Sequence, residues 1–315
     1  MKVNLIYTSD KHSAFTDLTF YQGQWFCAFR EASTHMSLDG QLVILTSADA
    51  ENWQEHSRQS WQGGDLRDPK FSITPNNQLL LTTGIRWRIT NNAKIRLYSV
   101  GWLFNGKTWS EPYFSDESAG KWRWGTCWHK QTAYSVSYSN LDAQGGLYSS
   151  PDGLNWQPVK KPFFPNPKIY SNESSLCFID DQAFCVVRRD KPGGAKGLLG
   201  KSSHPFTEWN WQELATSVGA PKLLKLSNGE FVVAGRFINY QRRTAKMRIY
   251  KLNIKKAKLK LWRELPSGGD CSYPGLVEKN SQLYISYYSS HEYKNAAIYL
   301  AKIPLHTKPR SKRFA

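Results

Sequence analysis

Long hydrophobic runs are missing from this sequence of 315 residues: nowhere do about 18 apolar residues follow one another, so no membrane-spanning helix is expected. No Gly-rich phosphate loop opens a helix, so we expect no nucleotide cofactor. No cluster of His, Asp and Glu has the spacing of metal ligands, so we expect no catalytic metal. Any chemistry is therefore expected to come from ordinary side chains.

Cysteine is scarce: there are 5, an odd number, and none has Cys-x-x-Cys spacing. Several lie in apolar strand-like runs such as Phe26-Cys27-Ala28, so we expect buried free thiols in a reducing compartment. The first residues contain no long apolar stretch of the kind that marks a signal peptide. The sequence as it stands predicts a cytoplasmic location, and a periplasmic or secreted one stays open if a signal was removed.

Acidic residues are in deficit: 25 Asp and Glu stand against 42 Lys and Arg, a formal charge of +17. Such a field attracts polyanions, which include nucleic acid, anionic lipid headgroups and acidic polysaccharide. The chain has no zinc-finger spacing, RNP-like motif or long basic helix, so we expect no nucleic-acid partner. Residues 307–315 form a short basic tail, which is expected to be solvated.

Helical periodicity is nearly absent, and apolar or alternating runs of about five residues take its place, separated by Gly, Asn, Asp and Pro. The runs recur in a unit of about 45 to 50 residues, which is typical of propeller blades. Six units can be counted. The sequence therefore predicts an all-β, six-bladed β-propeller in one domain, residues 1–306. The run from Val3 to Tyr7 is left over, and we expect it to close blade 6 as an outer strand.

A second repeat supports this organisation. The segments Ser47 to Trp53 and Ser150 to Trp156 share the pattern Ser-x-Asp-x-x-x-Trp. The Asp and Ser of such a segment are suited to cap a tight turn between the outer strands, while the Trp packs between blades.

Polar residues gather at the places where a propeller would bring them together. In this fold the first strand of each blade lies nearest the axis, and its start shares one face with the end of the second strand. Starts of first strands carry Asp17, Asp65 to Asp68, Arg123, Asn172-Glu173, Asp270 and Tyr273; ends of second strands carry Arg30-Glu31, Arg86, Arg188 to Asp190, Arg236 and His291-Glu292. We therefore expect a basic polar pocket on the axis.

These segments resemble those of the sialidase-like glycoside hydrolases, and the Ser-x-Asp-x-x-x-Trp repeats resemble the Asp-boxes of that superfamily. Asn172-Glu173-Ser174 resembles the family segment whose Glu partners the nucleophile, and Ser272-Tyr273-Pro274 resembles the segment that carries the nucleophilic Tyr. Ala28-Phe29-Arg30-Glu31 resembles the segment with a substrate-facing Arg. The polar loop that follows it, with His35 and Asp39, stands where the family has its acid/base residue.

One segment departs from the family pattern. Thr16-Asp17-Leu18 stands where sialidases have Arg-Ile-Pro, whose Arg grips the carboxylate of the sugar. The three-arginine clamp is therefore incomplete, and Arg67 is a candidate replacement. Arg67-Asp68-Pro69 also resembles the Arg-Asp-Pro motif of furanosidases, although those propellers have five blades.

The resemblance implies an exo-acting glycoside hydrolase on an acidic or polar glycan. Glu173 would take the proton of the nucleophile Tyr273, and Asp39 or His35 would protonate the leaving oxygen. Arg30, Arg189 and Arg243 would hold an acidic group. Further candidates for the pocket are Glu31, Arg67, Asp68, His129, His291 and Glu292.

Two alternatives stay open. The same residue types suit a polysaccharide lyase that neutralises a uronate, and a non-catalytic carbohydrate-binding propeller would need only the arginines and aromatic rings. Fold alone does not decide among them. The sequence also leaves the sugar, the linkage and the oligomeric state open.

Overall fold

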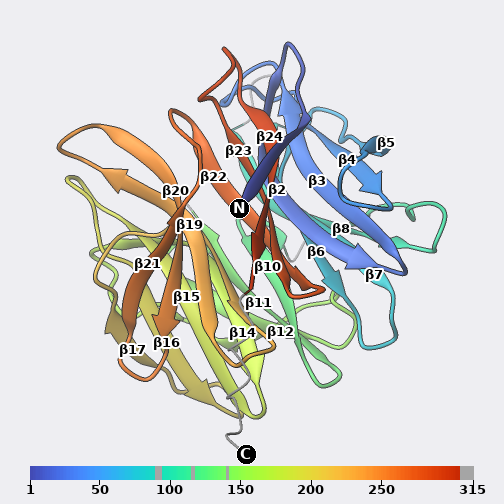
Figure 1. Cartoon of the computed structure of the whole chain (residues 1–315). Helices are drawn as coiled ribbons and strands as arrows, with labels where there is room; N and C mark the ends of the chain where they lie inside the picture. The colour runs from blue at the N-terminus through green and yellow to red at the C-terminus, as the bar shows by residue number, and fades with distance from the viewer. Residues whose placement is uncertain (89–93, 115–117, 140–141, 306–315) are drawn as a thin grey trace, which may run out of the picture.

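The computed structural model describes residues 1–88, 94–114, 118–139 and 142–305, and the regular elements within them are β-strands. These strands form six four-stranded antiparallel sheets around one axis (Figure 1). The innermost strand of each sheet contacts the innermost strands of both neighbouring sheets. The chain is thus a six-bladed β-propeller, as the sequence predicts. In the described part of the chain, no helix has the length and apolarity needed to cross a membrane.

Each blade begins at the axis and proceeds outward. Blade 1 consists of β2 (His12–Tyr21), β3 (Gln24–Ala32), β4 (Gln41–Ser47) and β5 (Gln54–Gln59). Blade 2 consists of β6 (Gly64–Ile73), β7 (Leu79–Trp87), β8 (Arg96–Phe104) and β9 (Tyr113–Phe114). Blade 3 consists of β10 (Trp122–His129), β11 (Thr132–Ser139), β12 (Asp142–Ser150) and β13 (Gln157–Lys160). Blade 4 consists of β14 (Tyr170–Ile179), β15 (Gln182–Asp190), β16 (Leu198–Ser203) and β17 (Asn210–Glu213). Blade 5 consists of β18 (Gly219–Lys225), β19 (Phe231–Asn239), β20 (Thr244–Asn253) and β21 (Lys258–Glu264). Blade 6 consists of β22 (Cys271–Lys279), β23 (Gln282–Ser289), β24 (Ala297–Pro304) and β1 (Lys2–Tyr7).

The N-terminal strand closes the ring. Strand β1 pairs with β24, with Lys2 opposite Lys302 and Leu5 opposite Tyr299. The prediction that the run from Val3 to Tyr7 completes blade 6 is therefore confirmed. Residues 307–315, the predicted basic tail, lie outside the described residues.

The core lies between neighbouring blades. Leu42 and Ile44 of β4 pack in one cluster with Leu79 and Leu81 of β7, and all four are fully buried. Burying one such side chain contributes about 1.5–3 kcal/mol relative to leaving it exposed. Because each sheet buries both of its faces in this way, the inner strands are held rigidly around the axis.

The turns of the Ser-x-Asp-x-x-x-Trp segments are built alike. In the β4–β5 turn, Oδ1 of Asp49 accepts hydrogen bonds from the backbone N–H groups of Glu51 and Asn52, each at 2.8 Å. In the β12–β13 turn, Asp152 accepts from Leu154 and Asn155 at the same distances. These aspartates serve their turns, far from the axis, and carry structure rather than chemistry.

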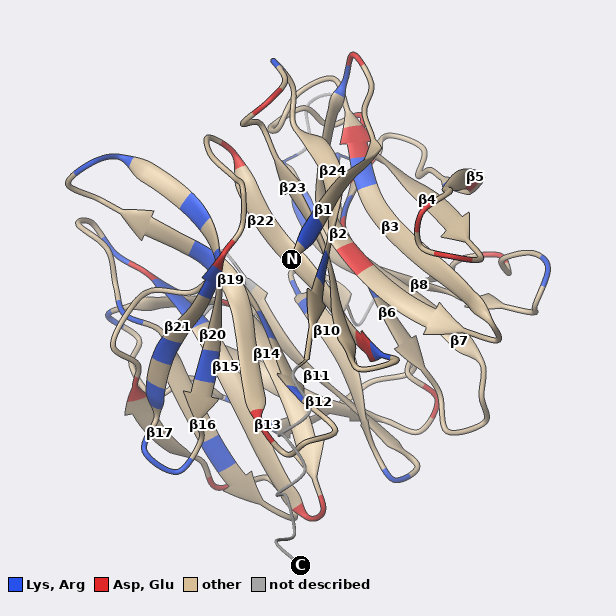
Figure 2. Cartoon of the chain, viewed as in Figure 1, with Lys and Arg blue, Asp and Glu red and all other residues tan. Residues whose placement is uncertain are grey.

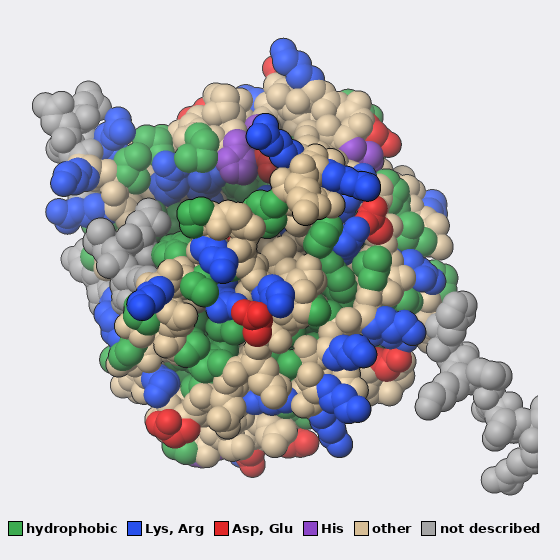
Figure 3. Space-filling model, turned by 90° about the vertical axis from the view of Figure 1, so that its left-hand side faces the viewer, with side chains coloured by type: hydrophobic (Ala, Val, Ile, Leu, Met, Phe, Trp, Pro, Cys, Tyr) green, Lys and Arg blue, Asp and Glu red, His purple; other side chains and the backbone are tan. Residues whose placement is uncertain are grey.

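The positive charge is spread over the molecule. Figure 2 shows Lys and Arg on the outer strands β16, β20 and β21 as well as near the axis. On the face shown in Figure 3, Lys and Arg side chains surround a hollow that contains hydrophobic side chains.

Candidate functional site

A β-bulge interrupts the innermost strand of all six described blades at the equivalent place. The pairs of residues that bulge out of the ladder are Phe15-Thr16, Asp68-Pro69, Trp124-Gly125, Asn172-Glu173, Ala220-Pro221 and Tyr273-Pro274. A bulge kinks its strand and changes the direction of the local side chains. Four of the bulges also hold a non-glycine residue in the left-handed region: φ is 64° for Phe15, 58° for Asp68, 46° for Ala220 and 53° for Tyr273. This backbone costs about 1–3 kcal/mol for each such residue and is common at functional sites.

The bulges open into a pocket of about 380 Å³ at the axis. It is lined by Phe15, His35, Met36, Arg67, Asp68, Arg86, Leu97, Trp122, Tyr138, Tyr170, Asn172, Glu173, Arg188, Arg236 and Tyr273. Five of the predicted site residues are therefore brought together: Tyr273, Glu173, His35, Arg67 and Asp68.

Tyr273 and Glu173 form the centre of the pocket. The Tyr273 hydroxyl donates a hydrogen bond of 2.5 Å to Oε1 of Glu173. Both groups are buried, with relative exposures of 9% and 2%. Burial, together with the charges of Glu173 and Asp68, raises the pKa of Tyr273 well above its ordinary value. At neutral pH this residue is therefore a phenol held against a carboxylate.

Glu173 is stabilised as that carboxylate. Nη1 of Arg188 lies 2.9 Å from each of its oxygens, and the backbone N–H of Ala220 donates to Oε2 at 2.7 Å. Burial alone would raise the pKa of Glu173, but the charge of Arg188 and the hydrogen bond from Tyr273 outweigh it, so the pKa lies below the ordinary value. The pair can thus pass a proton from phenol to carboxylate if the phenol oxygen bonds to a ligand.

Asp68 has the opposite character. It is 6% exposed, its Oδ1 has no hydrogen-bond partner among the described residues, and burial raises its pKa to about 6. A carboxyl group that is partly neutral near pH 7 can donate a hydrogen bond to a ligand as well as accept one. Asp68 and Glu173 are therefore two pocket carboxyls whose environments push their pKa values apart, which is how acid and base roles are separated in enzymes.

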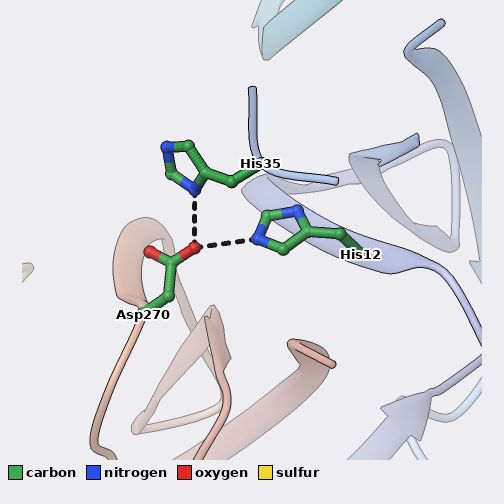
Figure 4. Close-up of side chains that lie close together, drawn as sticks. All are labelled: His12, His35 and Asp270. Carbon is green, nitrogen blue, oxygen red and sulfur yellow. Dashed lines mark hydrogen bonds and ion pairs between the residues drawn. The ribbon is translucent and has the colours of Figure 1, made fainter. Parts of the chain in front are cut away.

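His35 reaches the pocket edge from the loop between β3 and β4. Its Nδ1 lies 2.6 Å from Oδ2 of Asp270, and Nε2 of His12 lies 2.8 Å from the same oxygen (Figure 4). Tyr288 donates to the other oxygen of Asp270 at 2.7 Å. Burial would raise the pKa of Asp270, but the hydrogen bonds from His12 and His35 lower it. The carboxylate therefore orients His35, whose side chain is 42% exposed.

Buried arginines hold the loop that carries His35. Arg30 donates to Oδ1 of Asp65 at 2.6 Å, and both side chains are fully buried. Arg30 also donates to the carbonyl oxygens of Thr34 and Ser37 at 3.1 and 2.9 Å, and Arg67 donates to that of His35 at 2.6 Å. Arg30 was expected to face the substrate; in the structure it lies fully buried beneath this loop and does not line the pocket.

Three arginines of the pocket, Arg86, Arg188 and Arg236, lie at second-strand ends that were expected to face the axis, but they were not among the arginines assigned to hold the substrate. The resemblance pointed to Arg30, Arg189 and Arg243 instead. Arg236 forms no ion pair with the described residues, and its buried Nε has no hydrogen-bond partner among them. In blade 4 the residue that lines the pocket, Arg188, directly precedes the predicted Arg189 at the end of the second strand.

The remaining predicted residues lie away from the pocket, and most of them have a partner of their own. Arg189 pairs with Glu213, Glu31 with Arg58, His129 with Asp181, Glu292 with the Tyr299 hydroxyl and His291 with the Ser289 hydroxyl; Asp39 accepts hydrogen bonds from Ser33 in its own loop, and Arg243 is exposed in the β19–β20 turn. Burial would raise the pKa of Asp39, but hydrogen bonds from Ser33 and Ser37 lower it to about 2. A carboxyl group so acidic is a poor proton donor, so the structure leaves His35 as the loop residue at the pocket.

Asp17 does not take the place of a family arginine in the pocket. The bulge puts Phe15 there, and Asp17 lies further along β2, fully buried, 3.0 Å from Nζ of Lys222. It also accepts the backbone N–H of Phe71 at 2.8 Å. Asp17 therefore joins blades 1, 2 and 5 below the pocket.

The fold, a six-bladed β-propeller, is shared with solved structures that include sialidases. The structure is similar to a protein of unknown function from Dyadobacter fermentans, with a TM-score of 0.84 and 16% identity over 96% of this chain and 98% of that one. It is also similar to an intramolecular trans-sialidase from Ruminococcus gnavus, with a TM-score of 0.69 and 12% identity over 96% and 98% of the two chains.

A third similar structure is an α-L-arabinanase from Penicillium chrysogenum, with a TM-score of 0.72 and 15% identity over 97% of this chain and 98% of that one. No protein-family model matches the sequence, and no curated protein does so either. At these identities the likeness establishes the fold.

Proposed function

We propose that the axial pocket is the active site of a glycoside hydrolase that acts on an acidic or polar glycan. The observation that carries this proposal is the buried hydrogen bond of 2.5 Å between Tyr273 and Glu173. A phenol is a weak nucleophile until a base removes its proton, and Glu173 is an ionised carboxylate in direct contact with it. The sialidase and arabinanase of similar fold are named for action on glycans, which agrees with the proposal.

In the proposed reaction, Oη of Tyr273 forms a bond to the anomeric carbon while its proton moves to Glu173. The bond from that carbon to the leaving oxygen breaks, and His35 donates a proton to this oxygen. Water then attacks the glycosyl–tyrosine intermediate, loses a proton to His35, and restores the phenol with the proton held by Glu173. Two displacements at one carbon retain its configuration.

The walls of the pocket suit an anionic sugar. Arg67 and Arg86 of blade 2 and Arg236 of blade 5 supply positive charge from two sides of the axis, and guanidinium groups bind carboxylates with paired hydrogen bonds. Trp122 and Tyr138 of blade 3 also line the pocket, as nearly parallel rings with an interplanar angle of 19°. Flat aromatic faces pack against the apolar face of a pyranose, so charge and stacking together would orient the ring over Tyr273.

The test is turnover of a panel of aryl glycosides and acidic polysaccharides, including a sialoside, by the wild type and Tyr273→Phe. Release of the aryl group and of reducing ends is followed. We expect one substrate to be hydrolysed and Tyr273→Phe to remove that turnover. Tyr287→Phe is the matched control, because the Tyr287 hydroxyl donates to the carbonyl of Pro266 outside the pocket.

Other outcomes identify the alternatives. Products that absorb in the ultraviolet through a new double bond would make the protein a lyase. Binding of a glycan without any product would make it a carbohydrate-binding propeller. Turnover that survives in Tyr273→Phe would exclude Tyr273 as the nucleophile.

A further inference from the structure

A second ring of side chains surrounds the axis below the pocket. The first residue after each inner-strand bulge occupies the equivalent place in its blade. These residues are Asp17, Lys70, Thr126, Ser174, Lys222 and Gly275, one from each blade. The ring therefore contains two cations and one carboxylate, a net charge of +1 when all three are ionised.

A separate cavity of about 250 Å³ lies against this ring. Four ring members line it, Lys70, Thr126, Ser174 and Lys222, together with apolar side chains further along the inner strands such as Trp128, Leu176 and Leu224. Trp124 lines this cavity and packs on Tyr273, with ring centroids 5.6 Å apart, whereas Tyr273 lines the pocket. The aromatic pair thus divides the pocket from the cavity beneath it.

Lys70 is the unusual member of the ring. It is 5% exposed, and it forms no ion pair within the described residues. Its ammonium group lies 3.4 Å from the carbonyl oxygen of Thr16 and 4.8 Å from the Trp124 ring. Asp17 is engaged by Lys222 at 3.0 Å instead. The charges of Asp17, Asp68 and Glu173 act on Lys70, but none of these carboxylates forms an ion pair with it. Buried charges are normally paired directly, so the ring, with its net charge of +1, can accommodate one more negative charge.

The environment of Ser174 also indicates that the cavity can hold a ligand. It is 3% exposed and lines the cavity, and the described residues offer its hydroxyl no oxygen or nitrogen partner but only the thiol of Cys185. A buried hydroxyl without a partner costs about 1–3 kcal/mol, so such groups are usually satisfied. An ammonium that forms no ion pair with the described residues and a hydroxyl whose neighbour is a weakly bonding thiol therefore border one space that is large enough for a small ion.

We propose that this axial cavity binds a small oxyanion, such as phosphate, sulfate or a short carboxylate, between Lys70, Lys222 and Ser174. The ion would supply an additional negative charge, accept hydrogen bonds from both ammonium groups and accept the proton of the Ser174 hydroxyl. Because the ring joins all six blades, the bound ion would link blades 2, 4 and 5 across the axis. Burial, the main influence on Lys70, lowers its pKa, and a bound anion would oppose that shift.

This site is distinct from the pocket, whose arginines also attract anions. The experiment therefore measures thermal unfolding and phosphate affinity for four proteins: the wild type, Lys70→Met, Ser174→Ala and Arg236→Gln. Protein is first dialysed against a bulky sulfonate buffer, and ionic strength is held constant while phosphate is added. Lys107→Met, in an exposed turn, is the control for losing one positive charge.

We expect phosphate to raise the unfolding temperature of the wild type, Arg236→Gln and Lys107→Met, and to leave Lys70→Met unchanged. Ser174→Ala is expected to bind phosphate about tenfold more weakly, because one hydrogen bond to a charged group is lost. An effect that disappears in Arg236→Gln but persists in Lys70→Met would place the ion in the pocket and overturn the proposal. The absence of any shift in the wild type, or an equal shift in all the proteins, would also overturn it. None of these results depends on whether the protein hydrolyses a glycan.

Discussion

Tyr273 of blade 6 and Glu173 of blade 4 reach each other across blade 5, from equivalent bulges, through a hydrogen bond of 2.5 Å. Blade 5 contributes the backbone N–H of Ala220, from its own bulge, to the same carboxylate. Three successive blades therefore hold the Glu173 carboxylate in contact with the Tyr273 hydroxyl. This arrangement depends on the register of the inner strands, and its consequences can be tested one residue at a time.

Replacing Glu173 by Gln removes the proton acceptor but keeps the shape of the side chain. If Tyr273 is the nucleophile, kcat should fall by about 10²- to 10⁴-fold, which is the usual contribution of a general base. KM should change little, because Glu173 is already occupied by Tyr273, Arg188 and Ala220. Steady-state kinetics on the substrate that the panel identifies check this. An unchanged kcat would show that the proton leaves Tyr273 by another route.

Arg236 should select for acidic ligands. Its guanidinium lines the pocket and forms no ion pair with the described residues, so Arg236→Gln is expected to lower kcat/KM for an acidic glycan by about ten- to a hundredfold through the loss of a charge-assisted hydrogen bond. A neutral analogue of the same sugar should lose much less. Arg243→Gln, in the exposed β19–β20 turn, is the matched control and should behave as the wild type. Equal losses on the acidic and neutral substrates would mean that Arg236 supports structure only.

The fold could be predicted because it repeats. The same pattern of strands and turns recurs in each blade, so a weak pattern in one blade can be interpreted from the clearer pattern of another. The N-terminal run could be assigned to blade 6 because that blade still needed an outer strand. The site could be predicted only in part. Glu173 and Tyr273 lie in inner-strand segments that the sequence marks clearly, whereas Arg188 and Arg189 differ by one residue and point to opposite faces of β15. The β-bulge in the paired strand β14 determines which of the two arginines faces the pocket. A bulge depends on how two strands pair, so it cannot be predicted from the sequence of one strand.

The contact between His12 and Asp270 illustrates a second limit. The two residues are separated by 258 positions, and the closing of the ring by β1 and β24 brings blade 6 against blade 1. No local spacing marks such a pair. The ion pair between Arg30 and Asp65 was equally hard to predict. It joins blade 1 to blade 2, and no sequence motif in either segment indicates it.

The Arg30–Asp65 ion pair should be a major determinant of stability. Both side chains are fully buried, so Arg30→Met would leave the Asp65 charge without its closest partner. Removing one member of a buried ion pair typically costs about 3–5 kcal/mol in the free energy of unfolding. Lys251→Met breaks an exposed ion pair with Glu230 and should cost less than about 1 kcal/mol. Urea unfolding of the two variants checks this, and equal costs would contradict the structural role given to Arg30.

Asp68 should make the stability of the protein depend on pH in the direction opposite to most carboxylates. Burial raises its pKa to about 6, from an ordinary value of 3.8, so between these two values the folded protein binds more protons than the unfolded chain. The free energy of unfolding must therefore fall as the pH rises through this window. The full penalty, present above pH 6, is of the order of 3 kcal/mol for a shift of this size.

Asp68→Asn should remove that penalty. We expect the variant to match the wild type near pH 4 and to be more stable than it at pH 7 and above, as measured by urea unfolding at a series of pH values. Asp39→Asn should do the reverse: its pKa is lowered to about 2, so the stability that Asp39 contributes is present above pH 4 and is lost as the pH falls. If Asp68→Asn were less stable than the wild type at neutral pH, Asp68 would have a compensating partner, and its role as a carboxyl group held ready for a ligand would be refuted.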